Sequence, residues 1–287
     1  MLTTFTYKTI DGINLQLDHY STGRANSPAL VYFHGGGLIT GSRKEMTEAK
    51  ACLFTSAGIA VLSVDYRLAP ETKLPAIVDD VQDALHWIRN EGAMKLQLDP
   101  GRMAIMGSSA GGFLAMLAGT FPEKPQAIVS MYGYGSLLDS WTSQPSAHYL
   151  KMSRLRPEDI QRMIGTTPIA EGSMNRFLIY LYCRQRGVWA QEITGMDPTL
   201  RRSELEGYCP LLLADSHYPP AFLAHGDQDR DVPYGESLKM ANRLMSLGNT
   251  VEWITVPGAD HIFDQNLEAP PIKELYQKII GFLEEHF

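Results

Sequence analysis

The chain has 287 residues, of which 44% are hydrophobic, and a formal net charge of -7 at pH 7. A chain of this length suits one large domain or two small ones and can bury a substantial core. The acidic balance lacks the basic footprint of a nucleic-acid-binding protein, so we expect no nucleic-acid partner. The 3 cysteines are widely spaced without a C-x-x-C pair, which matches neither a disulfide framework nor a zinc site.

The first residues predict the cellular location. Residues 1–20 are polar and lack the apolar stretch of a secretory signal peptide. No run in the chain approaches the ~20 apolar residues that cross a bilayer. We therefore expect a cytoplasmic protein without a membrane span.

Short apolar runs follow a predicted hairpin. Residues 6–17 alternate loosely between apolar and polar side chains around Asp11-Gly12, which is a hairpin signal. The later runs are nearly continuous, as is typical of strands that are buried on both faces of a parallel sheet. These runs comprise residues 29–33, 59–64, 103–106, 127–131, 221–224 and 251–256.

Helical patterns separate these runs. Apolar side chains recur at helical spacing across residues 75–90, with charged side chains on the other faces, and Gly92 follows as a stop signal. Residues 235–247 and 272–283 have a similar pattern. The alternation of strands and helices predicts an α/β fold with a mostly parallel, doubly wound sheet.

Residues 135–219 break this alternation, because they are rich in aromatic residues, methionines and charges. A structureless loop of this length would be unusual, so we expect a mainly helical insertion between two strands. Residues 1–134 and 220–287 would then form the α/β domain. Because open α/β sheets bind ligands beyond the carboxyl ends of their strands, we favour a lid over helices that pack beside the sheet without contacting substrate.

A glycine-rich segment, GSSAGG at 107–112, lies between the third apolar run and a helix-compatible segment. This is the G-x-S-x-G pattern in its strand–turn–helix setting, where a serine hydroxyl is exposed at a sharp turn. Ser109 occupies the central position and is the predicted nucleophile. Ser108 would need glycines at the positions of Met106 and Ala110.

A serine nucleophile needs a base and an acid that orients the base, and in this type of fold they follow in the order acid, then histidine. The fifth apolar run leads into HGDQDRDVP at 225–233, where Asp227, Asp229 and Asp231 compete for the role of the acid. His261 lies in the loop after the last apolar run. It is the predicted base because it follows both the serine and the acid.

The segment HGGG at 34–37 follows the first apolar run. Consecutive glycines allow the backbone to approach a ligand and direct amides at it, although three glycines alone would also suit a flexible turn. Together with the amide of Ala110, they are predicted to form an oxyanion hole. Each such donor contributes about 3–4 kcal/mol to stabilising a tetrahedral intermediate.

Together these motifs resemble those of the hormone-sensitive-lipase-like esterases, a branch of the α/β-hydrolase fold. The resemblance spans nearly the whole chain outside the insertion. It rests on HGGG at 34–37, DYRLAPE at 65–71, GSSAGG at 107–112, HGDQDRDVP at 225–233 and DHIF at 260–263. It implies an α/β-hydrolase fold with a helical lid inserted between strands and a serine esterase that cleaves carboxylic esters without a metal or organic cofactor.

The resemblance also assigns roles. It implies a catalytic triad of Ser109, Asp229 and His261, where Asp229 is selected because the family's H-G-x-x-D-x-x-V-P pattern falls on it. The implied oxyanion donors are Gly36, Gly37 and Ala110. The DYRLAPE segment is implied to be structural.

Two departures affect the expected substrate range. Ser108 replaces the acidic residue or threonine that many family members have before the nucleophile, and HGGG begins too early for an N-terminal helical cap. Any cover must therefore come mainly from the insertion. By adjacency, Leu38, Trp141 and Ile262 are candidates for binding substrate.

Several alternatives stay open. The same triad could hydrolyse a lactone or amide, or transfer an acyl group, with a bulky secondary metabolite as substrate. A non-catalytic ligand-binding protein on a hydrolase scaffold is a further alternative, which retention of all three triad residues disfavours. The expected partner is a small-molecule ester. Apolar residues of the last helix, Ile279 and Phe282, suit either the core or a homodimer contact.

Overall fold

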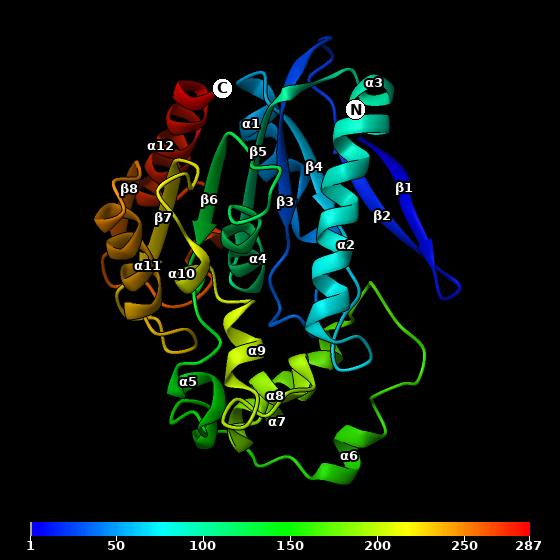
Figure 1. Cartoon of the computed structure of the whole chain (residues 1–287), viewed down its shortest axis with the longest axis vertical. Helices are drawn as coiled ribbons and strands as arrows, with labels where there is room; N and C mark the ends of the chain where they lie inside the picture. Colours follow the sequence, from blue (N-terminus) through cyan, green and yellow to red (C-terminus); the bar gives the residue numbers. More distant parts are fainter. Residues whose placement is uncertain (1) are drawn as a thin grey trace.

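An eight-stranded sheet crosses the molecule in the order β1-β2-β4-β3-β5-β6-β7-β8 (Figure 1). The computed structural model describes residues 2–287. β2 pairs antiparallel with both of its neighbours, β1 and β4. From β4 onward in this order, each strand pairs in parallel with the next. The strands are β1 (Leu2–Ile10), β2 (Ile13–Tyr20), β3 (Ser27–Phe33), β4 (Ala60–Val64), β5 (Leu98–Ser108), β6 (Ala127–Met131), β7 (Ala221–Gly226) and β8 (Val251–Val256).

The central strands explain the continuous apolar runs. Every residue of β4, β6 and β7 is buried, because helices cover both faces of the sheet. The edge strand β8 is half-buried along most of its length. The predicted hairpin and strands are confirmed, and β5 begins five residues before its predicted apolar run, with 11 residues in total.

Two hydrophobic clusters lie on opposite faces of the sheet. One includes residues of α2 (Leu74–Trp87), α4 (Ala110–Ala118) and α11 (Gly235–Ser246). The other includes residues of α1 (Glu48–Ser56) and α12 (Pro270–His286), with Ile279 and Phe282 both buried. The doubly wound arrangement is therefore confirmed, and these two side chains of the last helix belong to the core.

Short helices make up the segment between β6 and β7, and most of them gather at one end of the sheet, at the bottom of Figure 1. The longest, α7, has 10 residues. They are α5 (Ser140–Ser143), α6 (Pro157–Gln161), α7 (Phe177–Arg186), α8 (Trp189–Thr194), α9 (Arg202–Glu206) and α10 (Pro210–Leu213). Within residues 2–287, no helix combines the length and apolar character needed to cross a bilayer.

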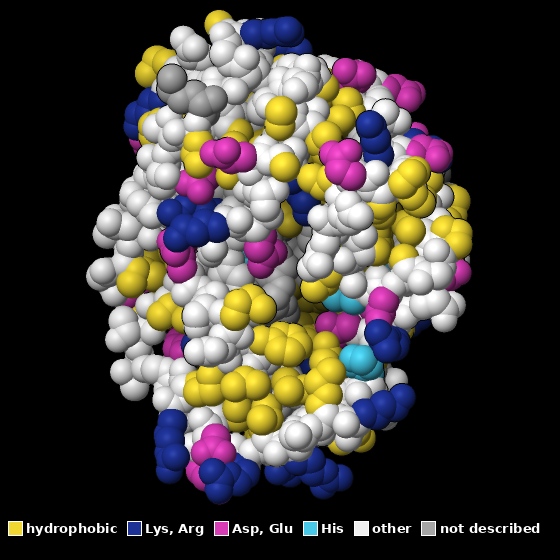
Figure 2. All heavy atoms as spheres, turned by 180° about the vertical axis from the view of Figure 1, so that it is seen from behind, with side chains coloured by type: hydrophobic (Ala, Val, Ile, Leu, Met, Phe, Trp, Pro, Cys, Tyr) yellow, Lys and Arg dark blue, Asp and Glu magenta, His cyan; other side chains and the backbone are white. Residues whose placement is uncertain are grey.

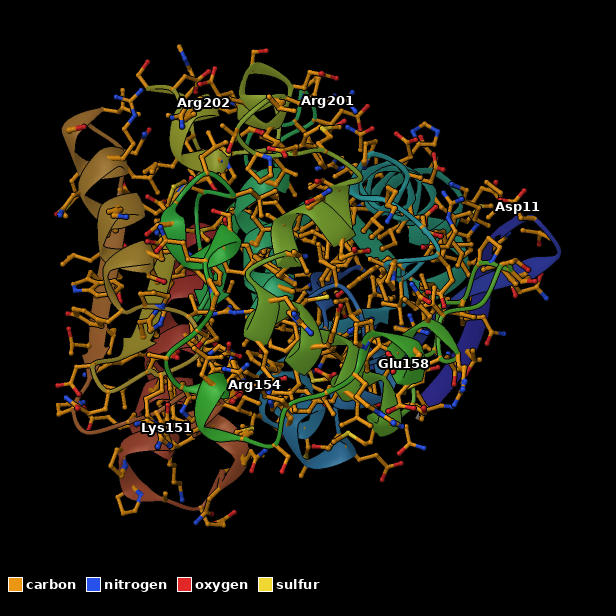
Figure 3. The ribbon with its side chains drawn as sticks, turned by 90° about the horizontal axis from the view of Figure 1, so that it is seen from below. Asp11, Lys151, Arg154, Glu158, Arg201 and Arg202 are labelled. Carbon is orange, nitrogen blue, oxygen red and sulfur yellow. The ribbon has the colours of Figure 1, made fainter. Side chains whose placement is uncertain are left out.

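This segment is tied to the loops that follow β3 and β4. Arg176 forms an ion pair with Glu71 (Nη2 to Oε2, 2.6 Å), and both side chains are buried. Trp189 donates a hydrogen bond from Nε1 to the carbonyl oxygen of Gly37 (3.0 Å). Seen from below, the segment lies across the end of the sheet, with the exposed Lys151, Arg154 and Glu158 along its outer side (Figure 3). These contacts place α7 and α8 against the HGGG turn.

Candidate active site

The backbone turns sharply at Ser109, between the end of β5 and the start of α4. Its φ of 55° and ψ of -116° lie in a region that side chains other than glycine rarely adopt. A Cβ atom on Gly107 would collide with the carbonyl group of Gly111, and one on Gly111 would collide with the carbonyl of Phe33. The glycines of G-x-S-x-G are therefore required by backbone packing around the turn.

Three predicted side chains meet above the carboxyl ends of β5, β7 and β8. The Nε2 atom of His261 lies 3.0 Å from Oγ of Ser109. The Nδ1 atom of the same ring lies 2.6 Å from Oδ2 of Asp229. A proton can therefore pass from the hydroxyl to an imidazole whose other nitrogen is held by a carboxylate.

Asp229 is held on both carboxylate oxygens. Oδ1 accepts the backbone N–H groups of Asp231 (2.8 Å) and Val232 (2.9 Å). Oδ2 accepts from His261 and also contacts Nε2 of His225 (3.0 Å). Burial alone raises the pKa of Asp229, but the hydrogen bonds to His225 and His261 outweigh it and hold the pKa well below its usual value. Asp229 is therefore ionised at neutral pH.

His225 supports Asp229 from behind. Its Nε2 atom faces two acceptors, Oδ2 of Asp229 (3.0 Å) and the carbonyl of Val232 (3.1 Å), so this nitrogen carries the proton. Its Nδ1 atom contacts Oγ of Ser237 (2.7 Å) on α11. His225 lies at the end of β7 and supports the loop that carries Asp229.

Acidic side chains surround the imidazole of His261. Burial lowers the pKa of His261, but the hydrogen bond to Asp229 and the negative charges of Asp231, Asp229 and Asp260 outweigh burial and raise it above its usual value. The Asp231 carboxylate lies 3.9 Å from Nε2. The ring of Tyr132 packs edge-on against the imidazole, with centroids 4.8 Å apart.

The HGGG turn brings backbone amides to the same place. Gly36 and Gly37 have φ values of 91° and 63°, and both line the cavity that contains Ser109. Over residues 2–287, the amides of Gly36, Gly37 and Ala110 have no protein acceptor. The amide of Gly35 instead donates to Glu45 (3.1 Å). The turn therefore leaves free donors beside the serine, as a helix N-terminus does.

His34 braces this turn as a neutral side chain. Its ring stacks on Tyr66, with centroids 4.3 Å apart, and its Nδ1 atom donates to the carbonyl of Gly35 (2.9 Å). Complete burial lowers the pKa of His34 to about 4. It has no contact with the Ser109 hydroxyl among the hydrogen bonds of residues 2–287.

A cavity of about 420 Å³ opens beside Ser109 and His261. Ile262 lines it, as predicted by adjacency, whereas Leu38 and Trp141 are not among its lining residues. Leu38 is completely buried in the core, and Trp141 packs against Trp189 and Arg184. The lining residues that sequence reasoning missed include Tyr132, Met174, Phe177, Tyr180, Asp231 and Leu267. For Met174, Phe177 and Tyr180, the aromatic and methionine bias of the insertion was the sequence signal, and Asp231 had been weighed only as a competing acid.

Apolar side chains continue from the cavity onto the surface. Exposed hydrophobic residues of the insertion include Met174, Phe177 and Leu178. Hydrophobic side chains gather in the lower half of Figure 2, next to histidine side chains.

A larger hollow of about 620 Å³ lies between α2, α4 and the α9–α10 region, but no predicted site residue lines it. In the part of the chain described, no cluster of His, Cys, Asp and Glu side chains is suited to hold a metal ion.

Comparisons with known proteins give a family and a fold. The BD-FAE family model matches residues 15–244. The non-reducing polyketide synthase ausA of Emericella nidulans is 28% identical over 343 aligned residues, which cover 99% of this chain and 14% of that protein. The chain thus spans a small part of the length of this curated relative.

Two solved structures share the architecture. An alpha/beta hydrolase superfamily protein from Enterococcus faecalis is 24% identical, with 99% of each chain covered and a TM-score of 0.79. A Pyrobaculum calidifontis esterase is 23% identical, with 99% of this chain and 85% of that chain covered, and a TM-score of 0.74. The fold is therefore that of the α/β-hydrolases, as the motifs predicted.

Proposed function

The chain belongs to the BD-FAE family, and we propose that it is a serine hydrolase that cleaves carboxylic esters through an acyl-enzyme on Ser109. The observation that carries the proposal is the continuous contact from Ser109 through His261 to Asp229, with distances of 3.0 Å and 2.6 Å. The Pyrobaculum calidifontis structure, which is named as an esterase and has the same fold, supports the proposal.

The proposed reaction has two stages. Oγ of Ser109 attacks the ester carbonyl while Nε2 of His261 takes its proton, and the amides of Gly36, Gly37 and Ala110 bind the oxyanion. The imidazolium then gives this proton to the leaving alcohol, and the acyl group stays on the serine. In the second stage the imidazole activates a water molecule, which releases the acid and restores the serine hydroxyl.

The geometry favours Asp229 over its two neighbours as the acid. Asp229 contacts Nδ1 of His261 directly (2.6 Å). Asp227 instead accepts the backbone N–H of Gly258 (2.7 Å). Asp231 lies on the opposite side of the ring, 3.9 Å from Nε2, where it cannot orient Nδ1.

The decisive experiment replaces the nucleophile. We expect Ser109→Ala to lower turnover of p-nitrophenyl butyrate by roughly 10⁴-fold or more, because the residues of a triad act as a unit. Labelling by a fluorophosphonate should disappear in the variant, while its thermal unfolding stays that of the wild type. Persistent turnover in Ser109→Ala, or a wild type that resists labelling, would contradict the proposal.

We also propose that residues 135–219 form a lid over a catalytic domain of residues 1–134 and 220–287. Met174, Phe177 and Tyr180 of this segment line the cavity at Ser109, which supports contact with substrate. The HGGG, DYRLAPE and GSSAGG segments favour placement of the chain near the hormone-sensitive-lipase-like esterases.

A second candidate function keeps the triad and changes the acyl group. The curated relative is a polyketide synthase by name, which favours a bulky polyketide acyl group that is released as a lactone or passed to an alcohol or amine. The apolar cavity wall suits such a group. Product analysis with aryl esters and a competing alcohol separates the candidates, since transfer yields a new ester and hydrolysis yields the free acid.

A further inference from the structure

Two side chains of α7 contact the loop that carries Asp229. Tyr180 donates its hydroxyl proton to Oδ1 of Asp231 (2.6 Å), and Nη2 of Arg184 donates to the backbone carbonyl of Asp231 (3.0 Å). Nη1 of Arg184 donates to the Tyr180 hydroxyl oxygen (3.1 Å) and lies 3.4 Å from Oδ1 of Asp231. The proposed lid therefore holds both the backbone and the carboxylate of Asp231.

Asp231 is connected to the triad in two ways. Its backbone N–H donates to Oδ1 of Asp229 (2.8 Å). Its Oδ2 atom lies 3.9 Å from Nε2 of His261, the nitrogen that faces Ser109. One residue thus supports the triad acid and also places a second carboxylate beside the nitrogen that takes up the serine proton.

Arg184 is enclosed rather than solvated. Its exposed fraction is 2%, and its guanidinium lies over the rings of Trp141 (4.8 Å), Tyr149 (5.8 Å) and Tyr180 (5.7 Å). A buried guanidinium is costly unless a carboxylate and hydrogen-bond acceptors compensate it. Here Asp231 supplies both, so the contact between α7 and the loop at 227–233, the acid loop, is a constrained pair and not an incidental surface bridge.

We propose that Tyr180 and Arg184 are positioning residues for the ester cleavage proposed above, on which this inference rests. They hold Asp231 so that its amide serves Asp229 while its carboxylate stays away from His261. A hydrogen bond between an imidazolium N–H and a carboxylate oxygen is about 2.7–2.9 Å long. The Asp231 carboxylate would therefore have to move by only about 1 Å to form one with Nε2 of His261. Such a pair would occupy the nitrogen that must face Ser109 and the leaving group.

The test begins with the two contacts. We expect Tyr180→Phe and Arg184→Met to lower kcat for p-nitrophenyl butyrate by about 10- to 100-fold, as small displacements of catalytic groups do. KM should change far less, because the cavity keeps its shape. Arg184→Lys should recover part of kcat, since it keeps the positive charge opposite Asp231.

A double variant separates positioning from simple structural support. In Tyr180→Phe/Asp231→Asn, residue 231 keeps its backbone N–H but can no longer form an ion pair with the imidazolium. We therefore expect kcat to rise above that of Tyr180→Phe alone. A side chain that served only to stabilise the fold would give no such rescue.

The same helix offers matched controls. Arg186 lies over the ring of Tyr182 (5.6 Å), as Arg184 lies over Tyr180, but within residues 2–287 neither side chain forms a hydrogen bond or ion pair with the loop at 227–233. Arg186→Met and Tyr182→Phe should keep kcat and KM near the wild-type values, and thermal unfolding checks that every variant folds.

The outcomes are distinct. An active wild type with unchanged kcat in Tyr180→Phe and Arg184→Met would overturn this inference and leave the proposed function standing. A loss of kcat without rescue by Asp231→Asn would also overturn it. A wild type without turnover or fluorophosphonate labelling would instead refute the proposed function.

Discussion

At the scale of single residues, the imidazole of His261 lies between two carboxylates. Asp229 holds Nδ1 at 2.6 Å, and Asp231 lies 3.9 Å from Nε2. The ring also faces Oγ of Ser109 and the phenol ring of Tyr132, and Asp260 accepts the backbone N–H of His261. The net negative surroundings raise the pKa of His261 despite its burial.

This arrangement predicts a pH shift. His261 must be neutral to accept the serine proton, so kcat/KM falls as the pH drops through the pKa of its ring. Asp231→Asn removes one of the charges that raise this pKa. We therefore expect the acid limb of the kcat/KM profile to move to lower pH, measured with p-nitrophenyl butyrate across pH 4–9. An acid limb that stays in place or moves upward would contradict the assignment of His261 as the base.

The turn at Ser109 predicts a stability effect. A Cβ atom on Gly111 would overlap the backbone of Phe33 and His34. We expect Gly111→Ala to destabilise the fold by about 1–3 kcal/mol or more, because the strand and helix must move apart. Denaturant unfolding measures the change.

Gly281 on α12 provides the matched control for this glycine. Nothing lies within 4 Å of a Cβ atom built there. Gly281→Ala should therefore stabilise the protein, by roughly 0.5–1 kcal/mol, through helix propensity alone. Equal effects at both glycines would show that crowding at residue 111 does not decide the outcome.

At the scale of elements, the insertion is attached through a buried ion pair. Arg176 contacts both oxygens of Glu71 (2.9 and 2.6 Å) and donates to the carbonyls of Ile39 and Ala69. We expect Arg176→Met to cost about 3–5 kcal/mol of unfolding free energy, because it leaves a buried carboxylate without its cation. Thermal or urea unfolding tests this value.

An exposed arginine of the same segment serves as control. Arg162 is 76% exposed and lies 3.6 Å from Asp159. Arg162→Met should change the unfolding free energy by less than about 1 kcal/mol, as is usual for surface pairs. A similar loss at both positions would argue against attachment through residue 176.

Phe177 at the start of α7 lines the cavity, whereas its neighbour Leu178 does not. Phe177→Ala should enlarge the acyl or alcohol site and raise the ratio of kcat/KM for hexanoate over acetate esters by about tenfold. Leu178→Ala, which removes an equally exposed apolar side chain, should leave the ratio unchanged. A ratio that responds equally to both variants would place the selectivity elsewhere.

These elements also show how far sequence reasoning reaches. Strands such as β4 and β6 were predictable because complete burial requires continuous apolar runs. The turn at Ser109 was predictable because local backbone crowding leaves no room for a Cβ atom at its glycines. The adjacency of His261 and Asp229 followed from motif order, and their catalytic roles stay predictions.

The insertion was not predictable in detail. Its helices have 4 to 10 residues and little periodicity, so long-range contacts decide where they lie. The pairing of Arg184 with Asp231 joins residues 47 positions apart and leaves no local pattern. Candidates chosen by adjacency, such as Leu38, therefore missed the cavity, whereas Ile262 lines it.

At the scale of the whole molecule, the cavity wall is assembled from distant parts of the chain. The glycine turn after β3, the serine after β5 and the histidine after β8 all belong to the sheet scaffold, and α7 supplies the opposite wall. The alignment with the polyketide synthase relative covers 99% of this chain and 14% of that protein. A stretch similar to this chain therefore lies within a far longer protein.

The segment between β6 and β7 leaves and rejoins the sheet at adjacent strands. A chimera that exchanged residues 135–219 for the equivalent stretch of a relative would keep every strand and the proton relay. It would, however, strip Asp231 of its hydroxyl and guanidinium partners. Grafts that also install a neutral residue at position 231 should therefore keep their activity more often. This gives protein engineers a compatibility rule for transferring substrate preference between relatives.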